Sequence, residues 1–274
     1  MIIDFHTHCF PDRLAGRAIE SLRRGSGGMN TTYDGTVNGL LRRMDESGVD
    51  VSVVLSIATN ARQQHSVNDF AASIHNDRLI PFGSVHPDAP DALDELERIA
   101  AMGLRGVKFH PDYQEFYVDE PRMKPIYEKI SSLGLITVFH SGYDVGFLGR
   151  HCSPKRLRNA LEWFNGATVI AAHFGGWASF DEVLETLCGQ PVYFDISLGC
   201  GHVPRPYAKE IIKKHGAGKI LFATDGPWQS AEDQIDFLNT LELSDSELDM
   251  IYSGNALKLL GQQVFCPADV KQKP

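Results

Sequence analysis

The stretch MIIDFHTH (residues 1–8) introduces a pattern that the chain repeats, a short apolar run that ends in polar residues of the metal-binding type. After its two histidines, His6 and His8, the same arrangement recurs at three later residues: His140, His173 and Asp225. In a closed barrel of parallel strands, the carboxyl ends of all strands lie on one face, however far apart they are in sequence. The pattern therefore predicts that these five side chains meet at the mouth of an α/β barrel.

Apolar runs alternate with amphipathic windows along the chain. The runs rich in β-branched residues predict strands at residues 1–5, 51–56, 80–85, 105–109, 135–139, 168–172, 192–196 and 220–224. Helical patterns cover residues 12–24, 36–47, 61–76, 91–102, 121–133, 154–165, 179–188, 204–215 and 230–241. Strands and helices in this alternation predict a single (β/α)8 TIM barrel. A Rossmann fold is disfavoured, because the turn after the first strand, HTHCFP, contains no GxGxxG motif.

The residues at the predicted boundaries suit this alternation. Glycine stands between a helix end and the next strand, where a left-handed C-cap is wanted, at Gly48, Gly103, Gly134 and Gly216. Proline, whose missing amide donor does no harm at a helix start, stands at Pro121, Pro154 and Pro204. No linker divides the chain, so we expect one domain over residues 1–266 and a polar tail over residues 267–274. Two extra C-terminal helices, at residues 245–252 and 253–260, are expected on the outside of the barrel.

The composition limits the partners and the location of the protein. The net charge of −9 comes from 35 acidic and 26 basic residues without a run of like charges, which argues against nucleic acid as a partner. The five cysteines include no CxxC pair, as expected for a reduced intracellular protein. The first strand leaves no room for a signal peptide, and no apolar run reaches the roughly 18 residues of a membrane span. We therefore expect a cytoplasmic protein, with a homodimer as one possible assembly.

His6 and His8 are the first candidate metal ligands. An HxH pair is weak evidence alone, since chance predicts about 0.4 such pairs in this composition. The two-residue period of a strand, however, aims both imidazoles to one side. With His140 and Asp225 they offer three imidazoles and a carboxylate, which suits one divalent ion, Zn²⁺ above all. Two alternatives stay open: a core role for His140, and a capping role for Asp225 in its Asp-Gly-Pro turn.

His173 and Asp225 are the candidate catalytic residues. His173 is either a further ligand or, as we favour, an acid/base group, because a neutral imidazole near bound water can move protons at physiological pH. Asp225 binds the metal, accepts a proton, or does both. A divalent ion lowers the pKa of its bound water from about 15.7 toward about 7, so the predicted chemistry is hydrolysis.

Further residues near the predicted mouth are candidates for substrate binding: Lys108, His110, Arg150, Trp177 and Trp228. Lys108 and His110 share one side of the fourth strand and point into the barrel if the alternation runs that way. Arg150 follows the fifth strand, and its planar guanidinium suits a carboxylate. The two tryptophans either wall the pocket or serve packing. The histidines inside predicted helices are expected to face solvent: His65, His75 and His215.

Six segments together resemble the amidohydrolase superfamily, in particular the amidohydrolase-related branch with small metal-dependent hydrolases, lactonases and aminocarboxymuconate-semialdehyde or γ-resorcylate type decarboxylases. They are DFHTH (4–8), GLRGVKFHP (103–111), VFHSG (138–142), AHFGG (172–176), LFATDGP (221–227) and GNA (254–256). The resemblance implies a metal bound by His6, His8, His140 and Asp225, with His173 beside it as catalytic group. Two-metal members often carry a carboxylated lysine at the end of the fourth strand, so Lys108 leaves a second metal possible.

The predicted function is metal-dependent hydrolysis of a small, carboxyl-bearing and therefore anionic substrate, such as a lactone, ester or amide. The first alternative is non-oxidative decarboxylation of an aromatic or dienyl acid, for which the 274-residue chain is compact beside the decarboxylases it resembles. The second alternative is a barrel that has lost its metal and only binds. Metal loss normally replaces a ligand, and all four positions keep ligand-competent side chains.

Overall fold

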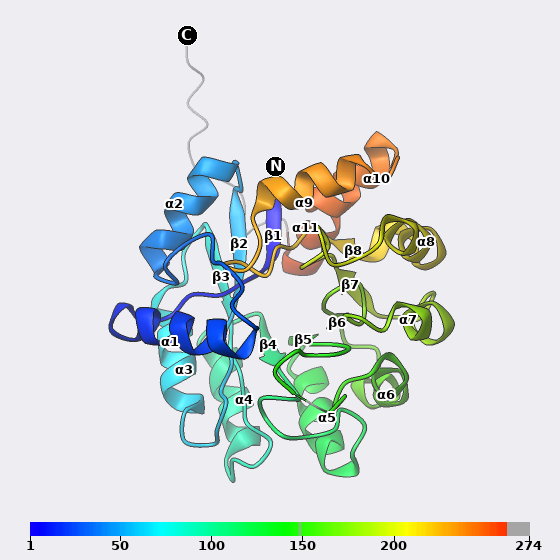
Figure 1. Ribbon diagram of the computed structural model, residues 1–274. Coiled ribbons are helices and arrows are strands. Elements are labelled where there is room, and N and C mark those ends of the chain that lie inside the picture. Colours follow the sequence, from blue (N-terminus) through cyan, green and yellow to red (C-terminus); the bar gives the residue numbers. More distant parts are fainter. Residues whose placement is uncertain (148, 262–274) are drawn as a thin grey trace.

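The computed structural model describes residues 1–147 and 149–261 and has its strands at the centre, surrounded by helices (Figure 1). The strands in this described part are β1 (Ile3–Thr7), β2 (Val51–Leu55), β3 (Leu79–Phe82), β4 (Gly106–Phe109), β5 (Ile136–Phe139), β6 (Val169–Ala171), β7 (Tyr193–Asp195) and β8 (Ile220–Leu221). Each overlaps a run predicted from the sequence. The predicted tail, residues 267–274, and residues 262–266 of the predicted domain lie outside the described residues.

The strands form two parallel sheets, one in the order β1-β2-β3 and one in the order β4-β5-β6-β7-β8. Backbone hydrogen bonds join the sheets at both junctions. Phe5 N donates to Phe222 O just after β8 (2.9 Å), and Lys108 N of β4 donates to Gly83 O just after β3 (2.8 Å). Isolated parallel bridges lie at the same two junctions. The strands therefore follow one another around a ring in sequence order, as the predicted (β/α)8 TIM barrel requires.

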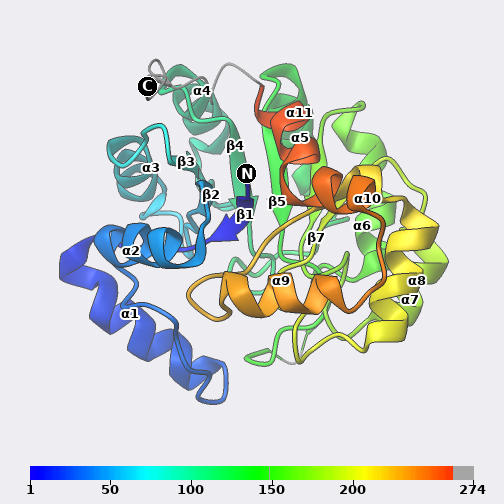
Figure 2. The same ribbon diagram turned by 90° about the horizontal axis from the view of Figure 1, so that it is seen from above.

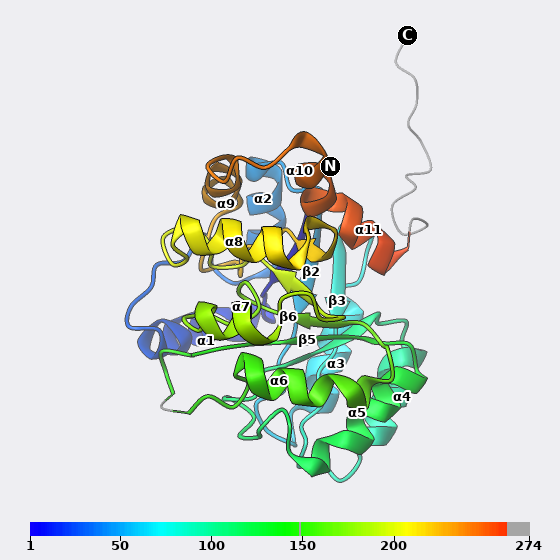
Figure 3. The ribbon, with the colours of Figure 1, turned by 90° about the vertical axis from the view of Figure 1, so that its right-hand side faces the viewer.

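Helices cover the outside of this ring. They are α1 (Asp12–Gly25), α2 (Val37–Ser47), α3 (Gln64–Ser73), α4 (Ala92–Ala101), α5 (Lys124–Ser132), α6 (Pro154–Ala160), α7 (Phe180–Thr186), α8 (Arg205–His215), α9 (Ala231–Asn239), α10 (Asp245–Asp249) and α11 (Asn255–Leu260). Seen from above, α1 and α2 lie on the side opposite α7 and α8 (Figure 2). Helices α6, α7 and α8 pack side by side (Figure 3). Within residues 1–147 and 149–261, no helix has the length and apolar character needed to cross a membrane.

Short helical turns complete the elements: the 3₁₀ turns Pro121–Met123, Leu161–Phe164 and Ala217–Lys219, and the π-helical turn Met250–Gly254. The predicted boundary glycines all have positive φ, 71° at Gly48, 79° at Gly103, 66° at Gly134 and 95° at Gly216. A side chain is disfavoured in this region of φ, so the sequence signal had a backbone cause.

Buried apolar side chains form two layers. The inner layer fills the ring with side chains such as Phe5, Val53 and Val138, and each fully buried side chain of this size contributes about 1.5–3 kcal/mol. The outer layer lies between the strands and the surrounding helices. Ala256 and Leu260 of α11 belong to the inner layer. Both predicted C-terminal helices are present, and α11 packs its apolar face against the inner layer.

Strand β1 contains a β-bulge at its carboxyl end. Two of its residues, Phe5 and His6, lie opposite a single residue of β2. A bulge re-aims side chains, and here His6 follows Phe5 toward the barrel interior, where its ring meets groups from β4 and from the segment after β8. Asp4 accepts hydrogen bonds from Thr224 N (3.0 Å) and Thr224 Oγ1 (2.6 Å), which ties β1 to the end of β8.

His215 corrects a sequence prediction. The prediction of solvent exposure holds for His65 and His75, but the side chain of His215 is buried. Its Nε2 donates to Val192 O (2.8 Å), its Nδ1 accepts from Gly189 N (3.1 Å), and its ring stacks on Phe194 at 3.8 Å between centroids. Both ring nitrogens have partners, so this histidine is a neutral part of the packing.

Candidate active site

The predicted site residues lie at the carboxyl ends of strands from both sheets. His6 is in β1 and His8 follows it, Lys108 is in β4 and His110 follows it, His140 follows β5, His173 follows β6 and Asp225 follows β8. All of them are buried except His8, which is half-buried. The barrel thus gathers polar side chains that are up to 219 positions apart, which is the arrangement expected at this face.

His6, His8 and Asp225 form a compact group, called here the ligand group. One potential ligand atom from each lies within 4.8 Å of the others. Asp225 Oδ1 is 3.2 Å from His6 Nε2 and 3.0 Å from His8 Nε2. Asp225 has a φ of 65°, which costs about 1–3 kcal/mol for a residue other than glycine. The fold therefore holds this carboxylate against a local backbone preference.

The protons on both imidazoles of the ligand group point away from Asp225. His8 Nδ1 is 2.7 Å from Leu55 O, and because a carbonyl only accepts, Nδ1 carries a proton. His6 Nδ1 is 2.8 Å from Asp195 Oδ2 and donates in the same way. In the neutral rings, the two Nε2 lone pairs therefore face a carboxylate oxygen. One cation, Lys108 Nζ, already lies 3.3 Å from His6 Nε2, and the three potential ligand atoms at this spacing fit a bound divalent ion as well.

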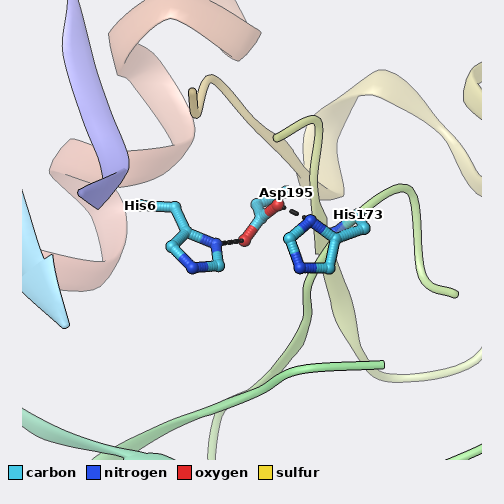
Figure 4. A group of neighbouring side chains, drawn as sticks. All are labelled: His6, His173 and Asp195. Carbon is cyan, nitrogen blue, oxygen red and sulfur yellow. Dashed lines mark hydrogen bonds and ion pairs between the residues drawn. The ribbon is translucent and has the colours of Figure 1, made fainter. Parts of the chain in front are cut away.

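Asp195, at the end of β7, is a site residue that the sequence interpretation missed. It lies between His6 and His173 and touches both (Figure 4). Its Oδ1 accepts from His173 N (3.0 Å) and from both the amide (3.0 Å) and the hydroxyl of Ser197. A charged residue inside the apolar run Val192 to Ile196 was the available signal, because a buried carboxylate requires partners.

His173 and His140 are in contact. His140 Nδ1 is 3.1 Å from His173 Nε2, and His173 Nδ1 is 2.8 Å from Ser197 Oγ. His140 Nε2 is buried and has no hydrogen-bond partner among the described residues. Burial, together with the neighbouring His140, keeps the pKa of His173 well below its ordinary value. His173 also has a positive φ of 59°, a second strained residue at this face.

His140 is grouped with His110 and Asp144, not with the ligand group. One ligand atom from each of these three lies within 4.8 Å of the others, and the His110 and His140 rings stack at 4.1 Å. His110 Nδ1 accepts from Tyr113 N (3.4 Å), which puts the proton of a neutral ring on Nε2, and Nε2 lies 3.3 Å from Asp144 Oδ2. Asp144 was not among the predicted site residues.

Lys108 is a buried cation beside the ligand group. Its Nζ is 3.3 Å from His6 Nε2, and its side chain is 1% exposed. Burial lowers the pKa of Lys108 to about 8, against the opposing pull of the Asp195 and Asp225 carboxylates. The predicted inward direction of Lys108 and His110 agrees with their burial in this face.

A family model described as Amidohydrolase matches residues 3–262. The chain belongs to the amidohydrolase family. No curated protein matches it. Among solved structures, an uncharacterised TIM-barrel protein from Bordetella bronchiseptica is similar with a TM-score of 0.78 and 20% identity, over 95% of this chain and 98% of that one.

Two further solved structures resemble this amidohydrolase. The 5-carboxyvanillate decarboxylase from Sphingomonas paucimobilis has a TM-score of 0.68 and 17% identity, over 94% of this chain and 98% of that one. A Pseudomonas putida protein assigned as a 2-pyrone-4,6-dicarboxylic acid hydrolase has a TM-score of 0.66 and 19% identity, over 95% and 97%. At these identities the likeness shows the fold, and it confirms the TIM-barrel prediction.

Family membership confirms that the amidohydrolase is an enzyme and fits a metal-dependent hydrolase acting on a small molecule. Of the remaining predicted substrate-binding residues, Arg150 is exposed, while Trp177 and Trp228 are half-buried. Trp177 N donates to Ser141 O (2.9 Å), and Trp228 N donates to Asp225 O (2.9 Å). Both tryptophans are thereby tied to segments that carry site residues.

Proposed function

We propose that this amidohydrolase is a metal-dependent hydrolase with one divalent ion per chain, held by His6, His8 and Asp225 and completed by His140. The convergence of two imidazole lone pairs on Asp225 Oδ1 carries this proposal, because two nitrogens and a carboxylate oxygen at this spacing form a ligand set for a divalent ion. His140 supports it with a buried, unpartnered Nε2. Three imidazoles and one carboxylate suit Zn²⁺, which we propose as the ion.

When bound, such an ion supplies a water of lowered pKa and polarises a substrate carbonyl. Residues of the chain then accept and donate the protons of the reaction. His173 rests neutral and is suited to accept a proton and return it to the leaving group. Asp225 is the second candidate acceptor, since burial raises the pKa of its carboxyl. His173 and Asp225 thus remain our candidates for the catalytic acid/base groups.

The substrate we propose is a small anion that bears a carboxylate, such as a lactone, ester or amide of a carboxylic acid. Lys108 supports this choice, because a buried ammonium beside the ligand group is a ready partner for a carboxylate. His110, Trp177 and Trp228 remain candidates for the same pocket. The names of two similar structures, the decarboxylase and the assigned hydrolase, both specify carboxyl-bearing molecules.

A cytoplasmic location is also proposed. The four cysteines in the described part of the chain, Cys9, Cys152, Cys188 and Cys200, are free thiols, as expected in a reducing compartment. Fractionation of the cells that make the protein checks this proposal.

The direct test is a substrate screen with the zinc-loaded protein, using simple lactones, esters, amides and hydroxybenzoates. Hydrolysis that is lost in His8→Ala and retained in the exposed control His65→Ala supports the proposal. Release of CO₂ from a hydroxybenzoate without hydrolysis replaces it with the decarboxylase alternative. Lys108→Met separates substrate recognition from metal binding, because we expect a raised KM for carboxyl-bearing substrates with the metal content unchanged.

A further inference from the structure

We propose that Asp195 and Ser197 are positioning residues that fix the tautomers of three histidines, so that His6 Nε2 and His140 Nε2 carry lone pairs and no proton. This inference rests on the proposed function, because the tautomers matter for metal binding at the proposed site. The tautomers themselves are deduced from hydrogen bonds alone. Neither Asp195 nor Ser197 is among the proposed metal ligands. Together they lie behind His6 and His173 at the carboxyl end of β7.

The series of hydrogen bonds begins at Asp195, whose carboxylate only accepts hydrogen bonds. Its Oδ2 receives the Nδ1 proton of His6 (2.8 Å), which leaves a lone pair on His6 Nε2, 3.2 Å from Asp225 Oδ1 and 3.3 Å from Lys108 Nζ. Its Oδ1 receives the amide of His173 (3.0 Å) and the amide (3.0 Å) and hydroxyl of Ser197. The carboxylate is fully buried, so these donors are what compensates its loss of water.

Ser197 fixes the tautomer of His173. A hydroxyl has one proton, and Ser197 gives it to Asp195 Oδ1. Its oxygen must therefore accept at the second short contact, the 2.8 Å distance to His173 Nδ1. His173 consequently carries its proton on Nδ1 and has a lone pair on Nε2.

His173 in turn sets the tautomer of His140. The 3.1 Å contact between His173 Nε2 and His140 Nδ1 requires one proton, and His173 Nε2 has none to give. His140 therefore donates from Nδ1 and keeps a lone pair on Nε2. His140 Nε2 is buried and has no hydrogen-bond partner among the described residues, as expected for a nitrogen whose lone pair binds a metal ion.

Loss of the Ser197 hydroxyl removes the preference for this order. In Ser197→Ala, the Nδ1 proton of His173 has no acceptor in a buried environment, so the wild-type tautomers lose their advantage and the Nε2–H tautomer of His173 becomes populated as well. His140 Nδ1 must then accept, which moves the His140 proton to Nε2 and occupies the lone pair meant for the ion. A change at a residue that is not a proposed ligand thus weakens metal binding.

The first test is histidine nitrogen NMR of the wild-type, metal-free protein with ¹⁵N-labelled histidine. We expect Nδ1–H tautomers for His6, His140 and His173. His110 and His215 provide internal references of the opposite tautomer, since in both Nδ1 accepts a backbone amide proton and the proton of the neutral ring is therefore on Nε2. An Nε2–H tautomer at His140 or His173 would overturn the inference, whether or not the protein binds metal.

The second test is zinc affinity by competition with a chromophoric chelator. We expect Ser197→Ala and Asp195→Asn to lose about 10- to 100-fold in affinity, and Ser197→Thr, which keeps the hydroxyl, to recover most of it. Ser52→Ala is the matched control, because Ser52 is buried and its hydroxyl has no partner among the described residues. Equal affinity in Ser197→Ala and wild type overturns the inference while leaving the metal site intact. No zinc binding by the wild type defeats the proposed function instead, and the tautomers then decide the inference alone.

Discussion

Two groups of the same residue types lie side by side at the mouth of this barrel and differ in where their protons are. In the ligand group of His6, His8 and Asp225, both imidazole protons are committed elsewhere, so only lone pairs meet the carboxylate. In the neighbouring pair, the proton of a neutral His110 ring is on Nε2, 3.3 Å from Asp144 Oδ2. The first arrangement offers lone pairs to an ion, and the second offers a ring N–H to a carboxylate. Hydrogen-bond partners on the far side of each ring, more than residue type, therefore distinguish the proposed metal site from the neighbouring pair.

The largest effect is expected from removing the carboxylate of the ligand group, and no effect from removing that of the neighbouring pair. Asp225→Asn should weaken zinc binding by more than about 100-fold, since changes at groups behind the ligands already cost 10- to 100-fold. Asp144→Asn keeps an acceptor for His110 and should leave the zinc affinity unchanged. Isothermal titration of both variants measures this difference. Loss of affinity in Asp144→Asn alone would exchange the roles of the two groups.

The second-largest effect is expected from metal removal, which should lower the free energy of unfolding. A metal ion whose free concentration is 100 times its Kd adds about 2.7 kcal/mol to the free energy of unfolding. For a chain of this size, that corresponds to a rise of roughly 5–10 °C in Tm. Thermal unfolding with chelator and with zinc checks the value in the wild type. An equal rise in Asp225→Asn would show that the stabilising ion binds elsewhere.

The smallest effect is expected from the protonation of His215, a buried histidine whose two ring nitrogens have hydrogen-bond partners within the protein. Burial lowers the pKa of His215 from 6.5 to about 4, so below pH 6.5 the unfolded chain binds more protons than the folded one. Its contribution to stability is therefore complete above pH 6.5 and is lost as the pH falls toward 4. Between pH 7.5 and pH 5 the loss from this residue is about 2 kcal/mol.

Urea unfolding of wild type and His215→Gln at both pH values measures that loss. The variant should be less stable at pH 7.5 but should lose about 2 kcal/mol less on acidification. The exposed control His65→Gln should follow the wild type. An unchanged pH dependence in His215→Gln would mean that protonation of His215 is not coupled to folding.

The sequence predicted the fold well because hydrophobic runs and boundary glycines act locally. Each predicted strand overlaps an observed one, and the four predicted C-cap glycines have positive φ. The side chains at the strand ends also came to one face, since the barrel topology alone requires it. Family membership agrees with the resemblance noted in the motifs.

Other features depend on contacts between distant segments and could not be predicted in this way. The bulge that turns His6 inward arises from pairing with β2, and the burial of His215 depends on partners in the segment before β7 and in β7 itself. Asp195 lies inside a run that was assigned to a strand, and its role was not predicted, although a lone carboxylate there signals a buried network. Asp144 lies in a loop, where an acidic residue carries no signal of its own.

Metal content per chain, measured by elemental analysis on protein purified without chelator, tests the central claim most directly. The proton arrangement of the ligand group predicts about one zinc or similar divalent ion per chain in the wild type, and none in Asp225→Asn. An Asp144→Asn protein should match the wild type. A wild type that holds no ion even after soaking in zinc would contradict the account, because the lone pairs of His6 and His8 would then bind no metal ion.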